Sequence, residues 1–174
     1  MMWFHWIAGC LLAFAWFSRI VDAAMGMPKI TDVTKPEWNR KPATATGDPR
    51  VSIIVPARDE EETIAETLRR LLTLDYDNFE IIAVNDRSTD RTGTIMASAA
   101  VSPDTLERLR VIHIQDLPDG WLGKTHAMWT AGEQATGEWL LFTDADVLFK
   151  PDSLRRVITY AEFEKADHTV LFPK

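Results

Sequence analysis

Short apolar runs alternate with segments of helical periodicity over residues 51–161. The runs predict strands, and the segments between and after them predict helices. A mainly parallel sheet follows, because strands separated by helices need crossover connections, and ligands are expected near the carboxyl ends of its strands. The chain is therefore predicted to have an α/β fold, with strands at 51–55, 80–84, 109–114 and 139–143, helices at 63–74, 91–100, 124–135 and 151–161, and a further strand beginning at 170–172.

The N-terminal segment is apolar enough to predict a membrane anchor. Met1 to Phe17 contains no Asp, Glu, Lys or Arg, and extension through Val21 reaches about the 20 residues that a bilayer requires. Tryptophans near both ends suit the two membrane interfaces. A cleaved signal peptide and a helix packed within a larger assembly are the alternatives.

Basic residues follow the apolar segment and do not precede it. The positive-inside tendency therefore predicts a single-pass membrane protein whose C-terminal domain is cytoplasmic. Prolines and glycines interrupt any periodicity after the segment and leave room for a short helix around Glu37 at most. The expected units are an anchor at 1–22, a juxtamembrane linker at 23–50 and a globular domain at 51–174.

Charge and cysteine content exclude several kinds of site. The formal net charge is -7 and Lys and Arg form no cluster, which argues against a nucleic-acid partner. Cys10 is the only cysteine, so the chain can form neither an internal disulfide nor a cysteine zinc site.

Two carboxylates, Asp144 and Asp146, follow the last predicted strand with one small residue between them. Like charges this close repel each other, so the pair predicts a divalent cation that bridges them to a ligand phosphate. Three other polar loops, at 56–61, 85–90 and 118–126, also follow predicted strands. The candidate site therefore combines four loops.

In their order and spacing, these loops resemble the nucleotide-sugar-binding half of a family 2 glycosyltransferase with the GT-A fold, over residues 51–174. Asp144-Ala-Asp146 resembles the family's DxD motif. The resemblance implies that Asp146 contacts a Mg2+ or Mn2+ ion held against the donor diphosphate, and that Asp144 touches the ribose or the metal shell.

The same resemblance implies further donor-binding residues. Asp86 would accept a hydrogen bond from the base, which suits the imide N–H of uracil and favours a UDP-sugar. Lys124, in a segment similar to the family's Gly-Lys-x-x-Ala, would neutralise diphosphate charge. Arg58, Asp59 and Glu60 occupy the family's Pro-x-x-Asn-Glu loop, which packs against the nucleoside; Asp59 stands where Asn is usual, which leaves the role of its side chain open.

Other polar or aromatic residues of these loops are expected to be structural. Asp90 suits an Asx turn at the entry to a helix. His126 is expected to pack or cap, and Trp121 is left open between loop packing and an acceptor contact.

The sequence contains fewer of the family's motifs for the acceptor than for the donor. Leu-Pro-Asp-Gly-Trp-Leu-Gly-Lys at 117–124 and Pro-Asp-Ser-Leu-Arg-Arg at 151–156 resemble the hopanoid-associated and ceramide-glucosyltransferase-like membrane branch, which implies a lipidic acceptor. Only residues 147–174 follow the DxD motif, and the family's later Gln/Arg-x-x-Arg-Trp segment is absent. No acceptor-activating base is assigned, because Glu162, Glu164 and Asp167 are expected to form a solvated face. The chain is expected to be the donor-binding half of an inverting enzyme.

Two other functions stay open. One is a catalytically inactive, membrane-anchored module that binds a nucleotide sugar or a partner. The other is a nucleotidyltransferase-like enzyme, which would also hold a metal with paired carboxylates; the lack of a glycine-rich, basic loop after the first strand counts against it.

Overall fold

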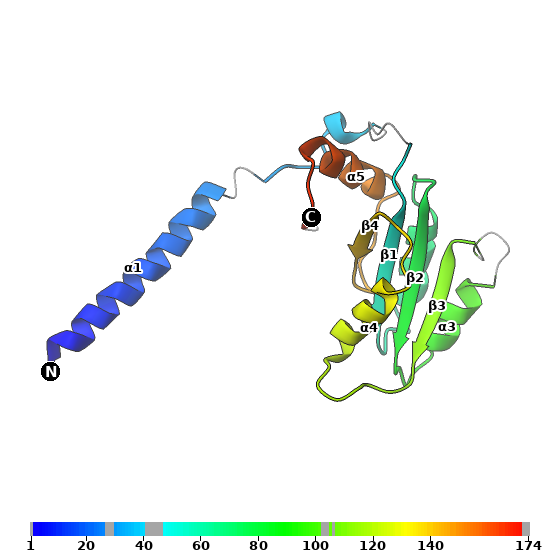
Figure 1. Cartoon of the computed structure of the whole chain (residues 1–174), viewed down its shortest axis with the longest axis horizontal. Coiled ribbons are helices and arrows are strands. Elements are labelled where there is room, and N and C mark those ends of the chain that lie inside the picture. Colours follow the sequence, from blue (N-terminus) through cyan, green and yellow to red (C-terminus); the bar gives the residue numbers. More distant parts are fainter. Residues whose placement is uncertain (1, 27–29, 41–46, 102–104, 106, 172–174) are drawn as a thin grey trace. The chain divides into compact units, whose positions relative to one another are not determined.

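The structure is a computed structural model that describes residues 2–26, 30–40, 47–101, 105 and 107–171 (Figure 1). The chain divides into two compact units, Met1–Val33 and Thr34–Lys174. The first unit contains the long helix α1 (Met2–Gly26), which runs four residues beyond the predicted anchor. Within it, His5–Gly26 is long and apolar enough to cross a membrane, a property that signal sequences share, and none of this stretch is buried.

The second unit is built on a sheet of four parallel strands in the order β3-β2-β1-β4. Val51 lies opposite both Phe79 and Trp139, and Ile81 lies opposite Leu109. The predicted parallel sheet is therefore confirmed. Its strands are β1 (Val51–Ala57), β2 (Phe79–Asp86), β3 (Leu109–Ile114) and β4 (Trp139–Phe142).

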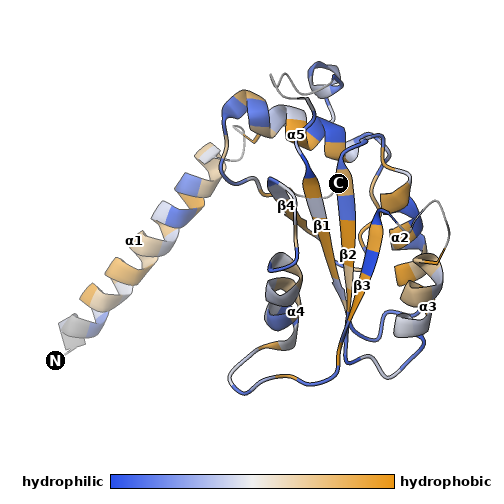
Figure 2. Cartoon of the chain, turned by 45° about the vertical axis from the view of Figure 1, so that its right-hand side comes forward, coloured by the Kyte–Doolittle hydropathy of each residue, from blue (hydrophilic) through white to orange (hydrophobic). Residues whose placement is uncertain are grey.

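Helices cover both faces of this sheet (Figure 2). On one face, residues such as Ile53 and Val55 of β1 pack with Leu68 and Met96 of the helices α2 and α3. On the other face, the β1 residue Ile54 packs with small residues of α4. Two-sided burial explains why the central strands are almost continuously apolar. The helices are α2 (Ile64–Leu72), α3 (Thr92–Ala99), α4 (Gly123–Gly132) and α5 (Ser153–Glu164), together with the short 3-10 helix η2 (Pro36–Trp38).

Part of the segment before β1 packs onto α5. Trp38 of η2 is buried, and its ring lies 5.1 Å from that of Tyr160 and 5.5 Å from that of Phe163, measured between centroids. The short helix expected around Glu37 is thus present, and aromatic packing holds it in place.

The strand β1 continues through Pro56, where the apolar run was expected to close. The carbonyl of Ile54 accepts a hydrogen bond from the N–H of Thr143, so the backbone of Ile54 faces β4. The backbone of Pro56, two residues further, faces the same side but lies beyond the end of β4. Because no ladder bond is available there, the missing N–H of proline costs nothing.

The strand expected to begin at residue 170 is not present. Val170 and Leu171 form no ladder with any described strand, and Val170 is exposed. Phe172 lies outside the described residues. Apolar, β-branched composition alone does not make a strand, because the backbone groups need a neighbouring strand to pair with.

Candidate functional site

A cavity of about 390 Å³ lies at the carboxyl ends of β1, β2 and β4. Such a volume lies within the usual range for small-molecule sites. Backbone and small side chains of Pro56, Ala57, Gly123 and Ala145 form part of its wall. The charged side chains that line it are Arg58, Glu60, Asp86, Lys124, Asp144 and Asp146, so the structure gathers six of the seven predicted site residues.

The two carboxylates of the DxD segment are held apart by a buried alanine. Ala145 is 3% exposed, whereas Asp144 and Asp146 are exposed. The hydroxyl of Thr67, on α2, donates a 2.7 Å hydrogen bond to the carbonyl oxygen of Ala145. Thr143 anchors the same turn to β1 through its backbone N–H. The turn is therefore fixed from within the core while both carboxylates stay at the cavity.

Lys124 brings a positive charge to this end of the cavity. Its ammonium forms an ion pair with the Asp144 carboxylate, and the two side chains are 63% and 57% exposed. Exposed pairs of this kind are weak, since water screens them and two long side chains must be ordered. Lys124 can therefore exchange Asp144 for an anionic ligand at little cost.

Asp86 is buried at the end of β2, and its carboxylate is clamped by the next residue. Its two oxygens accept hydrogen bonds from Nε and Nη2 of Arg87, at 2.7 and 3.0 Å. These bonds raise the pKa of the Arg87 guanidinium above its ordinary value. Gly123 completes the arrangement, since a Cβ there would lie 2.6 Å from Asp86 Oδ2 and 2.5 Å from Arg87 Nη2. A larger residue at this position would have to displace one of these two side chains.

Asp59 does not line the cavity but ties two of the loops together. Its carboxylate accepts a 2.7 Å hydrogen bond from the N–H of Thr89, and its own N–H donates to Ser88 Oγ at 3.1 Å. Its φ angle is 55°, in the left-handed region where Asn and Asp are enriched. This backbone conformation explains why the family's Asn position can hold Asp. The side chain, whose role was left open, positions the loop.

A further hydrogen bond joins the same two loops through Asp90. Asp90 accepts from the N–H of Thr92, which confirms the expected Asx turn, and from the N–H of Glu61. Burial raises the pKa of Asp90, but the hydrogen bonds from Thr92 and Glu61 more than offset this and hold the pKa below its ordinary value. The loops after β1 and β2 thus form one connected platform.

The aromatic residues near Lys124 pack against one another. The ring of Trp121 lies 5.3 Å from that of His126 and 5.4 Å from that of Trp129. Neither Trp121 nor His126 lines the cavity. The packing role expected for His126 is confirmed, and for Trp121 the structure provides loop packing.

Two structural roles were not predicted. Thr67 and Arg87 were assigned nothing, although Thr67 is a polar residue on the apolar face marked by Ile64, Leu68 and Leu71, and that mismatch is a usable signal. Arg87 carries no comparable signal, because a charged residue in a polar loop is unremarkable in sequence.

The donor set suits a metal that is shared with a ligand. Over the described ranges, no group of three or more His, Cys, Asp or Glu side chains is placed to hold an ion. Mg2+ is usually bound by one or two carboxylates together with substrate phosphates. It loses its bound water reluctantly, so water molecules usually supply several of its other oxygen ligands. Asp144 and Asp146 fit that pattern, with a diphosphate completing the shell.

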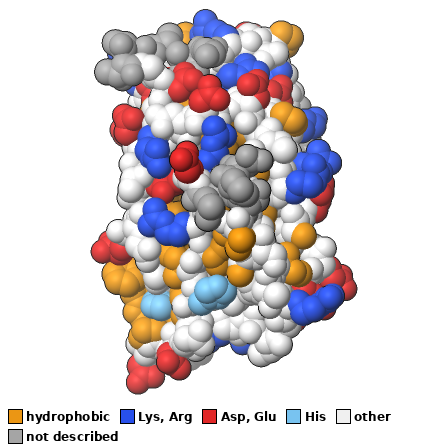
Figure 3. Space-filling model, turned by 90° about the vertical axis from the view of Figure 1, so that its right-hand side faces the viewer, with side chains coloured by type: hydrophobic (Ala, Val, Ile, Leu, Met, Phe, Trp, Pro, Cys, Tyr) orange, Lys and Arg blue, Asp and Glu red, His pale blue; other side chains and the backbone are white. Residues whose placement is uncertain are grey.

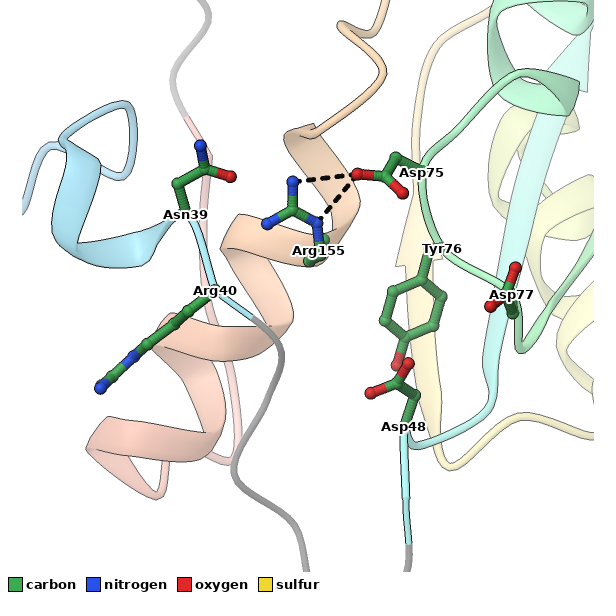
Figure 4. A pocket seen from close by; sticks show the side chains of 7 residues that line it. All are labelled: Asn39, Arg40, Asp48, Asp75, Tyr76, Asp77 and Arg155. Carbon is green, nitrogen blue, oxygen red and sulfur yellow. Dashed lines mark hydrogen bonds and ion pairs between the residues drawn. The ribbon is translucent and has the colours of Figure 1, made fainter.

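A second cavity, of about 350 Å³, lies near the amino ends of the strands and contains none of the predicted site residues (Figure 4). Arg155 pairs there with Asp75 at 3.0 Å, and the hydroxyl of Tyr76 donates to the carbonyl of Pro49. Burial raises the pKa of Tyr76, so this hydroxyl remains a neutral donor. These contacts close the fold around the start of β2.

One face of the molecule shows how charges of both signs are distributed on it. On the face shown in Figure 3, Lys and Arg are interspersed with Asp and Glu and form no continuous basic patch. Such a face lacks the clustered positive charge by which proteins follow a phosphate backbone.

Comparison with known proteins places the chain in a family. The model of the family described as "Glycosyl transferase family 2" matches residues 52–173. The beta-monoglucosyldiacylglycerol synthase of Synechocystis sp. is 30% identical over 158 residues, which cover 90% of this chain and 32% of that protein. The probable glycosyltransferase YdaM of Bacillus subtilis is 35% identical over 100 residues, covering 56% of this chain and 23% of YdaM. The chain thus spans about a third or less of these relatives.

Solved structures share the fold. The mannosyltransferase PcManGT from Pyrobaculum calidifontis, in complex with GDP-Man and Mn2+, superposes with a TM-score of 0.60 and 33% identity over 72% of this chain and 37% of that one. S. aureus TarS 1-349 in complex with UDP gives a TM-score of 0.56 and 29% identity over 67% of this chain and 33% of that one. With a family model that matches well over half of its residues, the chain belongs to glycosyl transferase family 2.

Proposed function

We propose that this chain is the donor-binding half of a membrane-anchored, inverting glycosyltransferase that uses a nucleotide-diphosphate sugar, preferably a UDP-sugar. One observation carries the proposal: Asp86, Lys124, Asp144 and Asp146 line a single cavity although they come from three separate segments of the chain. Together they offer a base acceptor, a cation for phosphate and a carboxylate pair for a metal. This is the set of groups that a sugar nucleotide requires.

Each residue has a proposed role toward the donor. Asp86 accepts the imide N–H of the base, and Arg58 and Glu60 pack against the nucleoside. Lys124 offsets the charge of the diphosphate. Asp144 and Asp146 would hold Mg2+ or Mn2+, which, when bound, supplies Lewis-acid stabilisation of the charge on the leaving diphosphate. The solved relative with GDP-Man and Mn2+ supports this pairing of sugar nucleotide and metal.

The proposed reaction is a direct displacement. The acceptor hydroxyl oxygen forms a bond to the anomeric carbon as the bond from that carbon to the diphosphate oxygen breaks, and the hydroxyl proton passes to a base. We assign that base to no residue described here. Glu162 accepts a 3.0 Å hydrogen bond from Nε1 of Trp139, and neither it, Glu164 nor Asp167 lines the donor cavity.

A lipidic acceptor is proposed on two grounds. Relatives that match most of this chain include a beta-monoglucosyldiacylglycerol synthase and a 4,4'-diaponeurosporenoate glycosyltransferase, whose names specify lipids. The helix α1 is long and apolar enough to hold the chain at a membrane, where such acceptors reside. We propose a single span with residues 34–174 in the cytoplasm, beside the nucleotide-sugar pool.

Calorimetric titration of the full chain in detergent with UDP, with and without Mn2+, tests the donor site. We expect metal-dependent binding that is lost in Asp146→Ala. The matched control is Asp167→Ala, which removes an exposed carboxylate outside the cavity and should bind as the wild type does. Failure of the wild type to bind any nucleoside diphosphate would contradict the proposal.

Two further measurements test the transfer activity and the membrane anchor. Incubation with UDP-sugars and membrane lipids measures transfer, and metal-dependent binding without transfer or hydrolysis would favour the inactive binding module. A reporter fused after Lys174 should be active in the cytoplasm, and the mass of the isolated chain should include residues 1–22. A reporter active on the other side, or a cleaved N-terminus, would contradict the anchor.

A further inference from the structure

The loop after β2 places an arginine where the backbone favours glycine. Arg87 has a φ angle of 56°, in the left-handed region that side chains with a Cβ adopt only at an energetic cost. Its N–H is shared between the carbonyl oxygens of Asn85 and Ile114, 3.2 Å from each, which fixes it between the ends of β2 and β3. A residue is kept in this conformation only where the surrounding contacts compensate for its energetic cost.

The side chain of Arg87 contacts the carboxylate of Asp86. Nε and Nη2 of Arg87 reach the two oxygens of Asp86, and the two side chains are 21% and 5% exposed. A side-on guanidinium pair of this kind fixes the plane of the carboxylate as well as its position, which a lysine cannot do. Arg87 does not line the cavity, whereas Asp86 does. Arg87 can therefore affect a ligand in the cavity only through its contact with Asp86.

Gly123 closes the other side of the same pair. Its Cα lies so near that a Cβ would meet both Arg87 Nη2 and Asp86 Oδ2 within 2.6 Å. The carboxylate is therefore confined between the guanidinium and the start of α4, and Asp86 also lines the cavity. An aspartate that accepts two N–H bonds from a guanidinium offers a ligand only acceptors.

We propose that Arg87 is a positioning residue for base selection: it holds the Asp86 carboxylate in the plane in which that group accepts a ring N–H, so that bases with a ring N–H at that position are selected. This inference rests on the proposed function, because it concerns the same donor site. Uracil and guanine carry such an N–H, whereas cytosine has a bare ring nitrogen at that position and would meet the carboxylate lone pair to lone pair.

The test is the ratio of two affinities, measured by calorimetry on the full chain with Mn2+. The wild type should bind UDP or GDP at least roughly tenfold more tightly than CDP. In Arg87→Lys, which keeps the charge but loses the two-point contact, that ratio should fall by roughly tenfold, mainly because UDP or GDP binds less tightly. Gly123→Ala, which displaces the guanidinium, should lower the ratio in the same direction.

Arg91→Ala is the matched control. Arg91 lies in the same loop, has an 80% exposed side chain and pairs with Glu61 rather than with Asp86. Its loss should leave the ratio unchanged. If Arg87 had a merely structural role, Arg87→Lys would lower the affinities for UDP, GDP and CDP equally and leave their ratio at the wild-type value. That result would overturn this inference alone. A wild type that binds no nucleoside diphosphate would overturn the proposed function and this inference together.

Discussion

The hydroxyl of Thr67 donates a 2.7 Å hydrogen bond to the carbonyl oxygen of Ala145, a residue 78 positions further along the chain. Thr67 is fully buried in α2, and Ala145 separates the two carboxylates of the DxD segment. The backbone of the candidate metal turn is therefore held by the core rather than by its own loop. The geometry of the two carboxylates depends on a side chain that never reaches the cavity.

Replacement of Thr67 by valine should disturb this turn while keeping the shape of the side chain. The Ala145 carbonyl would lose its buried partner, which costs about 1–3 kcal/mol of unfolding free energy. Metal-dependent UDP binding should weaken by roughly tenfold beyond any loss of folded protein. Calorimetry and denaturant unfolding of the full chain in detergent measure the two effects.

Thr159→Val serves as the control for that experiment. Thr159 is also buried, and its hydroxyl donates to the carbonyl oxygens of Arg40 and Arg155, away from the cavity. It should lose stability without losing nucleotide affinity at a temperature where the protein is folded. Equal binding losses in the two variants would argue against a specific role for Thr67.

Asp59 offers a substitution series that separates conformation from contact. Asn can adopt the same left-handed backbone and can accept the Thr89 hydrogen bond, so Asp59→Asn should be nearly neutral. Asp59→Ala loses the acceptor and should destabilise by about 1 kcal/mol, with weaker nucleotide binding as the loop loosens. Thermal unfolding and calorimetry check both; a neutral alanine variant would mean that the two loops are held without this contact.

Lys124 should matter to phosphates and not to the base. Lys124→Met should lower the affinity for UDP by roughly tenfold, because it removes a charge-assisted contact to the diphosphate. The affinity for uridine, which has no phosphate, should stay the same. Lys150→Met, an exposed lysine outside the cavity, controls for net charge. An equal loss for uridine would place Lys124 at the nucleoside instead.

A buried carboxylate at the opposite end of the sheet should make stability depend on pH. Glu80 accepts hydrogen bonds from Ser52 Oγ, Thr136 and Arg110, at 2.7 to 3.0 Å. Burial raises the pKa of Glu80, but the bonds from Ser52 and Thr136, with the charge of Arg110, outweigh this and hold the pKa below its ordinary value of 4.5. The folded protein therefore binds fewer protons than the unfolded chain near that pH.

The sign of the effect follows from this difference. The contribution of Glu80 to stability is fully present above pH 4.5 and is lost as the pH falls through the lower pKa of the folded state. Glu80→Gln should be less stable than the wild type by about 1–2 kcal/mol at neutral pH, and the gap should narrow in acid. Urea unfolding over this range measures it, with the exposed Glu164→Gln as a control. A gap that does not depend on pH would refute the assignment.

The strands and the paired carboxylates were predictable because they depend on local patterns. Runs such as 81–84 are apolar on both faces, and Asp144 and Asp146 closely follow such a run. Contacts between distant segments were not predictable. To predict the bond from Thr67 to Ala145, one must know which loop α2 packs against. The left-handed backbone of Asp59 and Arg87 also could not be predicted from their residue types alone.

Where a strand begins or ends was also decided by adjacent strands rather than by composition. The strand β1 passes through Pro56 because β4 stops short of it, and Val170 and Leu171 form no strand because none of the described strands pairs with them. In each case the deciding fact is the presence or absence of an adjacent backbone. A sequence pattern reports what a segment can bury, not what lies beside it.

The strands carry the Glu80 network at their amino ends and the donor loops at their carboxyl ends, and the two sets have no residue in common. Under the proposed function, changes in Arg58 or Asp86 would therefore alter the preferred nucleotide while the Glu80 network that stabilises the sheet stays unchanged. If the proposed function holds, substitutions that change the preferred nucleotide should therefore leave the free energy of unfolding of the sheet unchanged.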